Sequence, residues 1–152
     1  MHTTLSLIQQ QRLIANRYPK AKTWFPKEHR GKVLWADLTL QVSPIYESYR
    51  VLIGYTLGVQ PKVFVDSPEP VKQAHGIQTP HLNYDESLCL YDPGKGQWAD
   101  TDAIAHTTIP WTLRWLFHYE NWLVTGVWLG DTTAPVTKDD AIPNLPGLEK
   151  PQ

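Results

Sequence analysis

Residues 33–42 have the sequence VLWADLTLQV. Leu34, Leu38 and Leu40 lie an even number of positions apart, and side chains that alternate in this way share one face of an extended strand. Residues 49–57 show the same alternation after a polar turn that contains a proline. We therefore predict two neighbouring β-strands, each with one face in the core.

Two shorter segments extend this sheet. Residues 62–66 form a short strand after a turn with glycine and proline, and residues 22–28 precede the turn at Gly31. Parallel neighbours would need crossover connections of about a dozen residues or more, and the connections here are tight turns. The sequence thus predicts a four-stranded antiparallel meander.

Helical periodicity brackets the sheet. Between Thr4 and Tyr18 the apolar side chains share one face of a helix, and Pro19 removes the next backbone donor. From Pro110 to Gly126 the period is helical again. The apolar face of this second helix consists of Trp111, Trp115, Leu116, Tyr119, Trp122 and Leu123. We expect that face to pack on the sheet rather than to bind a cofactor, which gives an α+β fold.

Proline interrupts the rest of the chain. Three prolines between residues 68 and 80 predict that no regular structure forms before His81. Beyond residue 130 the chain contains prolines and no apolar periodicity. We predict that residues 1–130 form one domain, and that residues 131–152 form an irregular tail that packs little and is dispensable for folding.

The composition limits the classes of function. The 152 residues suit one domain, and fourteen Lys and Arg against fifteen Asp and Glu leave a net charge of −1. So small a charge provides no field that would hold a nucleic acid or an acidic membrane surface. No apolar run reaches the roughly 18 residues that span a bilayer, and the first residues do not resemble a signal peptide. We expect a cytoplasmic protein with no membrane partner and no direct nucleic-acid partner.

Cys89 is the one cysteine of the chain, which excludes an internal disulfide. A lone cysteine is more often a packed apolar residue than a nucleophile, but the segment before it, residues 80–88, contains reactive groups. His81 supplies an imidazole that can hold charge, and Asn83 supplies an amide that can stabilise the oxyanion formed when a thiolate attacks an acyl carbon. These residues indicate acyl transfer through Cys89.

Other chemistry has less support. The spacing of His75, His81 and Cys89 matches no common metal-ligand pattern, and a glycine-rich phosphate loop is absent. Asp85 and Glu86 are adjacent carboxylates, which we interpret as a solvated edge. We therefore expect no metal and no cofactor.

Several segments resemble the ubiquitin-conjugating enzymes. Residues 87–90, Ser-Leu-Cys-Leu, are similar to the Ser-Ile-Cys-Leu sequence around the conjugating cysteine of that family, and residues 81–83, His-Leu-Asn, resemble its His-Pro-Asn motif. Residues 44–51 resemble its Pro-Tyr-Glu-Gly-Gly turn, and residues 61–65 its proline-led last strand. The segments most similar to the bacterial relatives encoded in CBASS antiphage operons are Leu88-Cys89-Leu90-Tyr91, Ile109-Pro110-Trp111, Trp115-Leu116, Tyr119-Glu120-Asn121-Trp122-Leu123 and residues 125–130.

The resemblance implies a fold and a reaction. The implied fold is that of the ubiquitin-conjugating enzymes (UBC-like), with an N-terminal helix, the meander, an irregular active-site stretch and C-terminal helices. The implied activity is thioester transfer, in which Cys89 carries the C-terminus of a protein and passes it to a nucleophile. The implied donor is a cGAS/DncV-like nucleotidyltransferase, and the reaction requires no metal or nucleotide.

Two departures from the family pattern leave the oxyanion group open. Leu82 replaces the proline of the motif, and Asn83 lies nearer to Cys89 than in the family. Either His81 or Asn83 is therefore the candidate. Two other functions fit the same residues. One is a non-catalytic binding module of this fold in which Cys89 only packs, and the other is a cysteine hydrolase that removes conjugates with His81 as its base.

Overall fold

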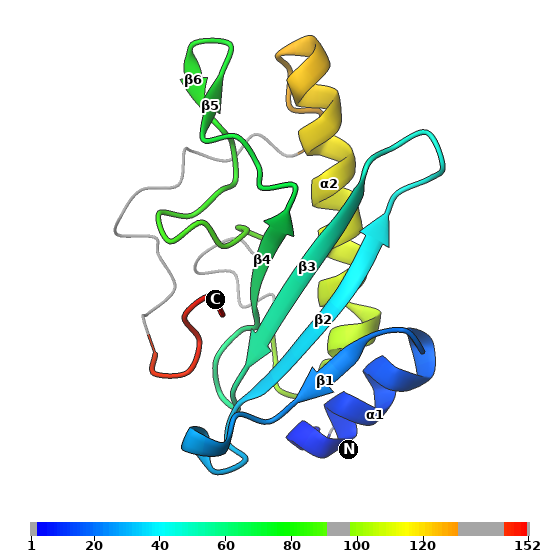
Figure 1. The fold of residues 1–152 in the computed structure, drawn as a ribbon, viewed down its shortest axis with the longest axis vertical. Coiled ribbons are helices and arrows are strands. Elements are labelled where there is room, and N and C mark those ends of the chain that lie inside the picture. Colours follow the sequence, from blue (N-terminus) through cyan, green and yellow to red (C-terminus); the bar gives the residue numbers. More distant parts are fainter. Residues whose placement is uncertain (1–2, 91–97, 131–144, 152) are drawn as a thin grey trace.

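A computed structural model of the chain describes residues 3–90, 98–130 and 145–151. Figure 1 shows a helix, a sheet, a small hairpin and a long second helix in chain order. The elements are α1 (Leu7–Arg17), β1 (Lys22–Trp24), the 3-10 turn η1 (Lys27–His29), β2 (Leu34–Gln41), β3 (Ser48–Tyr55), β4 (Lys62–Ser67), β5 (Gln73–Ala74), β6 (Ile77–Gln78), the 3-10 turn η2 (Ile104–His106) and α2 (Thr108–Thr125). The predicted α+β class is confirmed.

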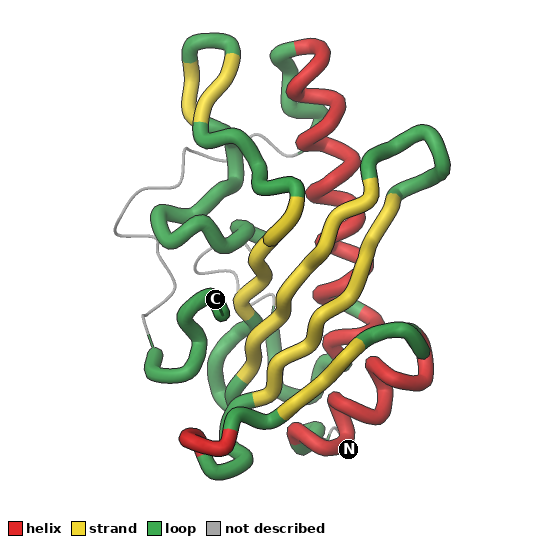
Figure 2. Tube along the Cα trace, viewed as in Figure 1, coloured by secondary structure: helices red, strands yellow, loops and turns green. Residues whose placement is uncertain are grey.

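The sheet is the predicted meander. Its strands follow the order β1-β2-β3-β4 and every neighbouring pair is antiparallel, as the yellow strands of Figure 2 show. Trp35 of β2 lies opposite Gly54 of β3, where a Cβ atom would come within 2.7 Å of the indole ring. Glycine at this position therefore gives the Trp35 ring its space.

The main core lies between the sheet and α2, which runs behind β2 and β3 in Figure 1. The sheet's inward side chains are Leu34, Ala36, Leu38, Leu40, Tyr49, Val51, Ile53, Tyr55, Val63 and Val65. Helix α2 contributes Trp115, Leu116, Tyr119 and Trp122 to the same cluster. The alternation predicted for β2 and β3 is confirmed, and so is the packing of the aromatic helix face on the sheet.

Both helices begin and end for identifiable reasons. Ser6 caps α1 in a reciprocal arrangement, since its hydroxyl accepts from Gln9 N–H at 3.1 Å and its own N–H donates to Gln9 Oε1 at 2.8 Å. Pro110 lies in the first turn of α2, and Gly126 ends that helix with a φ of +78°. None of the described helices has both the length and the apolar composition for a bilayer crossing.

The prediction of no regular structure before His81 is wrong in part. Strands β5 and β6 form a two-stranded hairpin that stands beyond the end of the main sheet (Figure 1). Its two turn residues, His75 and Gly76, both have positive φ, at +55° and +76°. Such a turn matches the twist of a hairpin, and the three prolines do not prevent it because none lies between Gln73 and Gln78.

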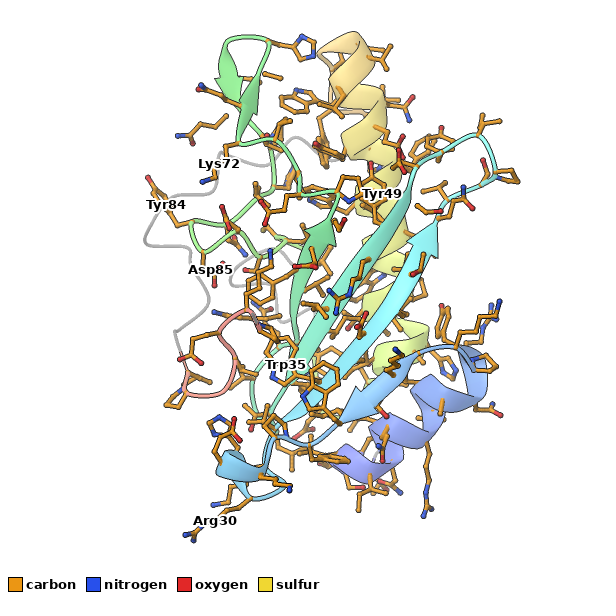
Figure 3. All side chains as sticks on the ribbon, viewed as in Figure 1. Arg30, Trp35, Tyr49, Lys72, Tyr84 and Asp85 are labelled. Carbon is orange, nitrogen blue, oxygen red and sulfur yellow. The ribbon has the colours of Figure 1, made fainter. Side chains whose placement is uncertain are left out.

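The prediction that the C-terminal tail packs little is wrong for residues 145–151. Leu148 has no exposed surface and belongs to a second apolar cluster on the outer face of the sheet, with Val33, Trp35, Leu52 and Phe64. The Trp35 indole N–H donates to the Gly147 carbonyl at 3.0 Å, and Figure 3 shows Trp35 on this outer face. One apolar side chain that fills a sheet hollow produces no periodicity in the sequence. Residues 131–144 lie outside the described residues.

Candidate active site

The segment that leads to Cys89 folds back on itself. The Cys89 backbone N–H donates to the His81 carbonyl at 2.9 Å, and an antiparallel bridge pairs Leu82 with Leu88. Within the irregular active-site stretch, residues 81–89 therefore form a tight turn with isolated bridges, which we call the cysteine hairpin. It brings the His81 backbone next to that of Cys89.

The edge strand β4 holds the cysteine hairpin. Leu88 N–H donates to the Val63 carbonyl at 2.8 Å, and Ser87 pairs with Phe64 as an antiparallel bridge. Leu88 is 2% exposed and lies in the main core, whereas Cys89 is only half-buried. The cysteine hairpin thus adds a short stretch of antiparallel pairing to the edge of the sheet and places Cys89 at the edge of the core.

An ion pair fixes the turn of the cysteine hairpin. Lys62, 1% exposed, places Nζ 2.6 Å from Asp85 Oδ2, and Asp85 Oδ1 accepts the Ser87 N–H at 2.9 Å as well as the Ser87 hydroxyl. Partial burial acts to raise the pKa of Asp85, but the hydrogen bonds from Lys62 and Ser87 outweigh it and hold that pKa below its ordinary value. Figure 3 shows Asp85 beside β4. Asp85 is exposed, as the interpretation of a solvated edge requires, and its carboxylate also binds the buried Lys62.

Asn83 lies inside this network. It is 6% exposed, its amide nitrogen donates to Ser87 Oγ at 3.1 Å, and its N–H donates to the Ser87 carbonyl at 2.8 Å. Its carbonyl accepts the Glu86 N–H at 2.9 Å, which closes the turn. Glu86 has a φ of +73° there, and its carboxylate lies 3.2 Å from the exposed Lys72 Nζ. The contacts of Asn83 thus support the shape of the cysteine hairpin.

His81 is held at both its backbone and its ring. Its φ is +55°, a conformation that few residues other than glycine adopt. Its carbonyl accepts the Trp115 indole N–H at 2.9 Å in addition to the Cys89 N–H. Its ring lies 5.1 Å from the Trp128 ring, which also contacts His118 at 5.8 Å between ring centres.

One face of α2 holds the segment between β4 and Cys89 at three points. Besides Trp115, the Tyr119 hydroxyl accepts the Val71 N–H at 2.8 Å, and the Leu123 carbonyl lies 3.0 Å from His75 Nε2. These helix positions lie four residues apart and therefore share a face. The sequence pattern predicted that this face lies in the core but did not predict its polar contacts. Hydrophobic periodicity shows which side chains are buried, and it does not show the direction of an indole N–H or a phenol hydroxyl.

The described residues offer no metal centre. No group of three or more His, Cys, Asp or Glu side chains comes together within that part of the chain. Within that part of the chain, the half-buried Cys89 lies next to the backbone of His81, whose carbonyl is held by two hydrogen bonds.

The order of helix, antiparallel meander, cysteine hairpin and second helix defines an E2-like protein of the UBC-like fold. The sequence profile of E2-CBASS, described as Type II CBASS E2 protein, matches residues 10–135, and the chain belongs to this family. Membership confirms the resemblance to bacterial E2-like proteins of CBASS operons and gives the protein an E2-like role in CBASS antiphage defence. A comparison with curated proteins found no match.

Proposed function

We propose that the protein is a thioester transferase that carries a protein C-terminus on Cys89. One observation carries this proposal: in a chain of the E2-CBASS family, the one cysteine ends a hairpin that is pinned to β4 and is itself half-buried. A cysteine that served only as packing would have no need of a hairpin held by an ion pair and two sheet contacts.

The proposed reaction has two steps. First, the Cys89 thiolate attacks the activated C-terminal carbonyl of the donor, so that a C–S bond forms and the bond to the activating group breaks. Second, an amine attacks the thioester carbonyl, an amide bond forms, the C–S bond breaks, and the proton lost by the amine leaves the thiol neutral or passes to solvent. No metal or cofactor enters either step.

We assign different roles to the two polar residues before Cys89. His81 is the candidate for stabilising charge at the reacting centre, because an imidazole can hold charge and the His81 backbone lies next to that of Cys89. Asn83 is the candidate for holding the hairpin turn, because its amide donates to Ser87 Oγ. The proposed donor is a cGAS/DncV-like nucleotidyltransferase in the cytoplasm, and this partner rests on the family.

The test is co-production with a cGAS/DncV-like nucleotidyltransferase from the same genome, followed by intact-mass analysis. The parent is expected to form an adduct that thiols cleave. Cys89→Ser offers an oxygen nucleophile, and the ester it forms resists reductant. Cys89→Ala is expected to keep the fold and to form no adduct. If Cys89→Ala forms the same covalent species as the parent, the transferase proposal fails.

A matched pair of histidine variants tests the role of His81. His81→Gly removes the imidazole, adds no other side-chain donor and suits the positive φ, which glycine adopts readily. His75→Gly is the control, because His75 has the same φ of +55° and its ring also packs on a tryptophan, Trp122, at 5.5 Å. We expect His81→Gly alone to slow adduct formation or discharge. Equal rates in both variants would remove His81 from the reaction.

Two outcomes would replace the proposal with its rivals. Iodoacetamide that reacts with Cys89 only after unfolding would indicate a packed cysteine and a binding module. Release of free product from a purified conjugate, without formation of a new one, would indicate a hydrolase.

A further inference from the structure

The His81 carbonyl accepts hydrogen bonds both from α2 and from Cys89. A carbonyl oxygen has two lone pairs, and this one accepts from Cys89 N–H and from the Trp115 indole N–H, each at 2.9 Å. Trp115 is 4% exposed and belongs to the main core, so its ring is fixed by packing. Trp115 thus reaches the backbone of Cys89 through this shared acceptor.

Trp115 also supports the imidazole of His81. The Trp115 ring meets the Trp128 ring edge-on at 5.6 Å, and the Trp128 ring in turn contacts the His81 ring at 5.1 Å. Trp115 also stacks on Tyr119, with the ring centres 5.1 Å apart and the planes 15° from parallel. Both the carbonyl and the ring of His81 therefore depend on where this one indole lies.

The conformation of His81 needs such support. A non-glycine residue at φ +55° occupies a sparsely populated region, and it stays there only when surrounding contacts fix it. We propose that Trp115 is a positioning residue of the acyl-transfer site, whose indole N–H holds the His81 carbonyl and thereby sets the position of Cys89. This inference rests on the proposed transferase function and adds to it a residue that reaches Cys89 through the His81 carbonyl.

The variants separate the hydrogen bond from the packing. Trp115→Ala would remove a whole buried ring and is expected to unfold the protein. Trp115→Phe instead keeps an aromatic ring and deletes the N–H. Trp122→Phe is the matched control, because Trp122 lies on the same helix, is fully buried, and its indole N–H has no hydrogen-bond partner among the described residues.

The first measurement is amide hydrogen exchange. In Trp115→Phe we expect the Cys89 amide to exchange about tenfold faster than in Trp122→Phe, since a net hydrogen bond of ordinary strength corresponds to roughly this factor. The Leu88 amide is the internal reference, because it donates to Val63 and not to His81. Its exchange should be the same in both variants. Equal acceleration at Leu88 and Cys89, or none at Cys89, overturns the inference.

The second measurement is adduct formation with the nucleotidyltransferase donor. Trp115→Phe is expected to lower the first-order rate at saturating donor by about tenfold relative to Trp122→Phe, with an unchanged donor concentration at half the maximal rate. If the parent forms no adduct, the proposed function fails. If the parent forms it and both variants match one another, the role of Trp115 alone is refuted.

Discussion

Replacement of Leu148 by alanine tests whether the C-terminal segment stabilises the fold. The Leu148 side chain is fully buried against the outer face of the sheet, where Trp35 and Phe64 form part of its pocket. Truncation of a buried leucine costs about 2–5 kcal/mol. We expect a cost at the low end of this range. Residues 145–151 can leave the sheet, so the variant cannot lose more than the free energy with which this segment docks.

This limit makes the prediction quantitative. Ordering a residue costs about 1–2 kcal/mol in conformational entropy. The net free energy of docking residues 145–151 is therefore only the amount by which Leu148 burial and the hydrogen bonds exceed that cost. We expect Leu148→Ala to lower the free energy of unfolding by about 2 kcal/mol and Tm by roughly 4–8 °C. A chain that ends at Asn144 loses the whole segment, so its Tm should fall at least as far.

The assay is thermal unfolding followed by circular dichroism, with the Trp35 indole N–H resonance as a local reporter. Lys150→Ala is the control, because Lys150 contacts Glu69 at 3.0 Å and Asp66 at 3.4 Å near the surface, and such pairs contribute about 0–1 kcal/mol. The chemical shift of the Trp35 indole N–H should change in Leu148→Ala and remain that of the parent in Lys150→Ala. A chain truncated after Asn144 with the Tm of the parent would refute the reasoning.

Two further predictions concern the sheet and the cysteine hairpin. Gly54→Ala is expected to lower the free energy of unfolding, measured in urea, by about 1–3 kcal/mol, since the new Cβ would meet the Trp35 ring at 2.7 Å. In the double variant with Trp35→Leu, part of that loss should be recovered. Losses of the two single variants that simply add in the double variant would contradict this explanation. Because the folded pKa of Asp85 is lowered, its contact with Lys62 contributes stability above the unfolded pKa that is lost as pH falls through the folded pKa. The urea midpoint of Asp85→Asn should therefore lie below that of the parent near pH 7, and the gap should narrow below about pH 4; a constant gap would exclude this role.

The regular elements could be predicted because each one repeats a pattern. The strands around Leu38 and Ile53 alternate, and α2 repeats its aromatic residues at helical spacing, so hydrophobicity alone locates them. Cys89 and His81 were found by residue type and by resemblance. Their roles stay predictions.

The remaining features depend on single contacts that leave no pattern. Glu86 turns the cysteine hairpin with a φ of +73°, although its residue type does not favour that conformation. Gln10 is fully buried on α1, where its amide donates to the Asp102 carbonyl at 2.7 Å and accepts the Ile104 N–H at 2.9 Å. A glutamine at a helix position is normally interpreted as exposed, and only the distant backbone it contacts makes it internal.

The order of the elements along the chain has a consequence for synthesis on the ribosome. The meander is complete at Ser67, but α2, which covers its inner face, is finished only at Thr125. At about 5–20 residues per second, the ribosome needs roughly 3–12 s to add residues 68–125. During these seconds the apolar inner face of the strands is not yet covered by α2. A chaperone that binds exposed apolar strands has its best access to this protein in that interval.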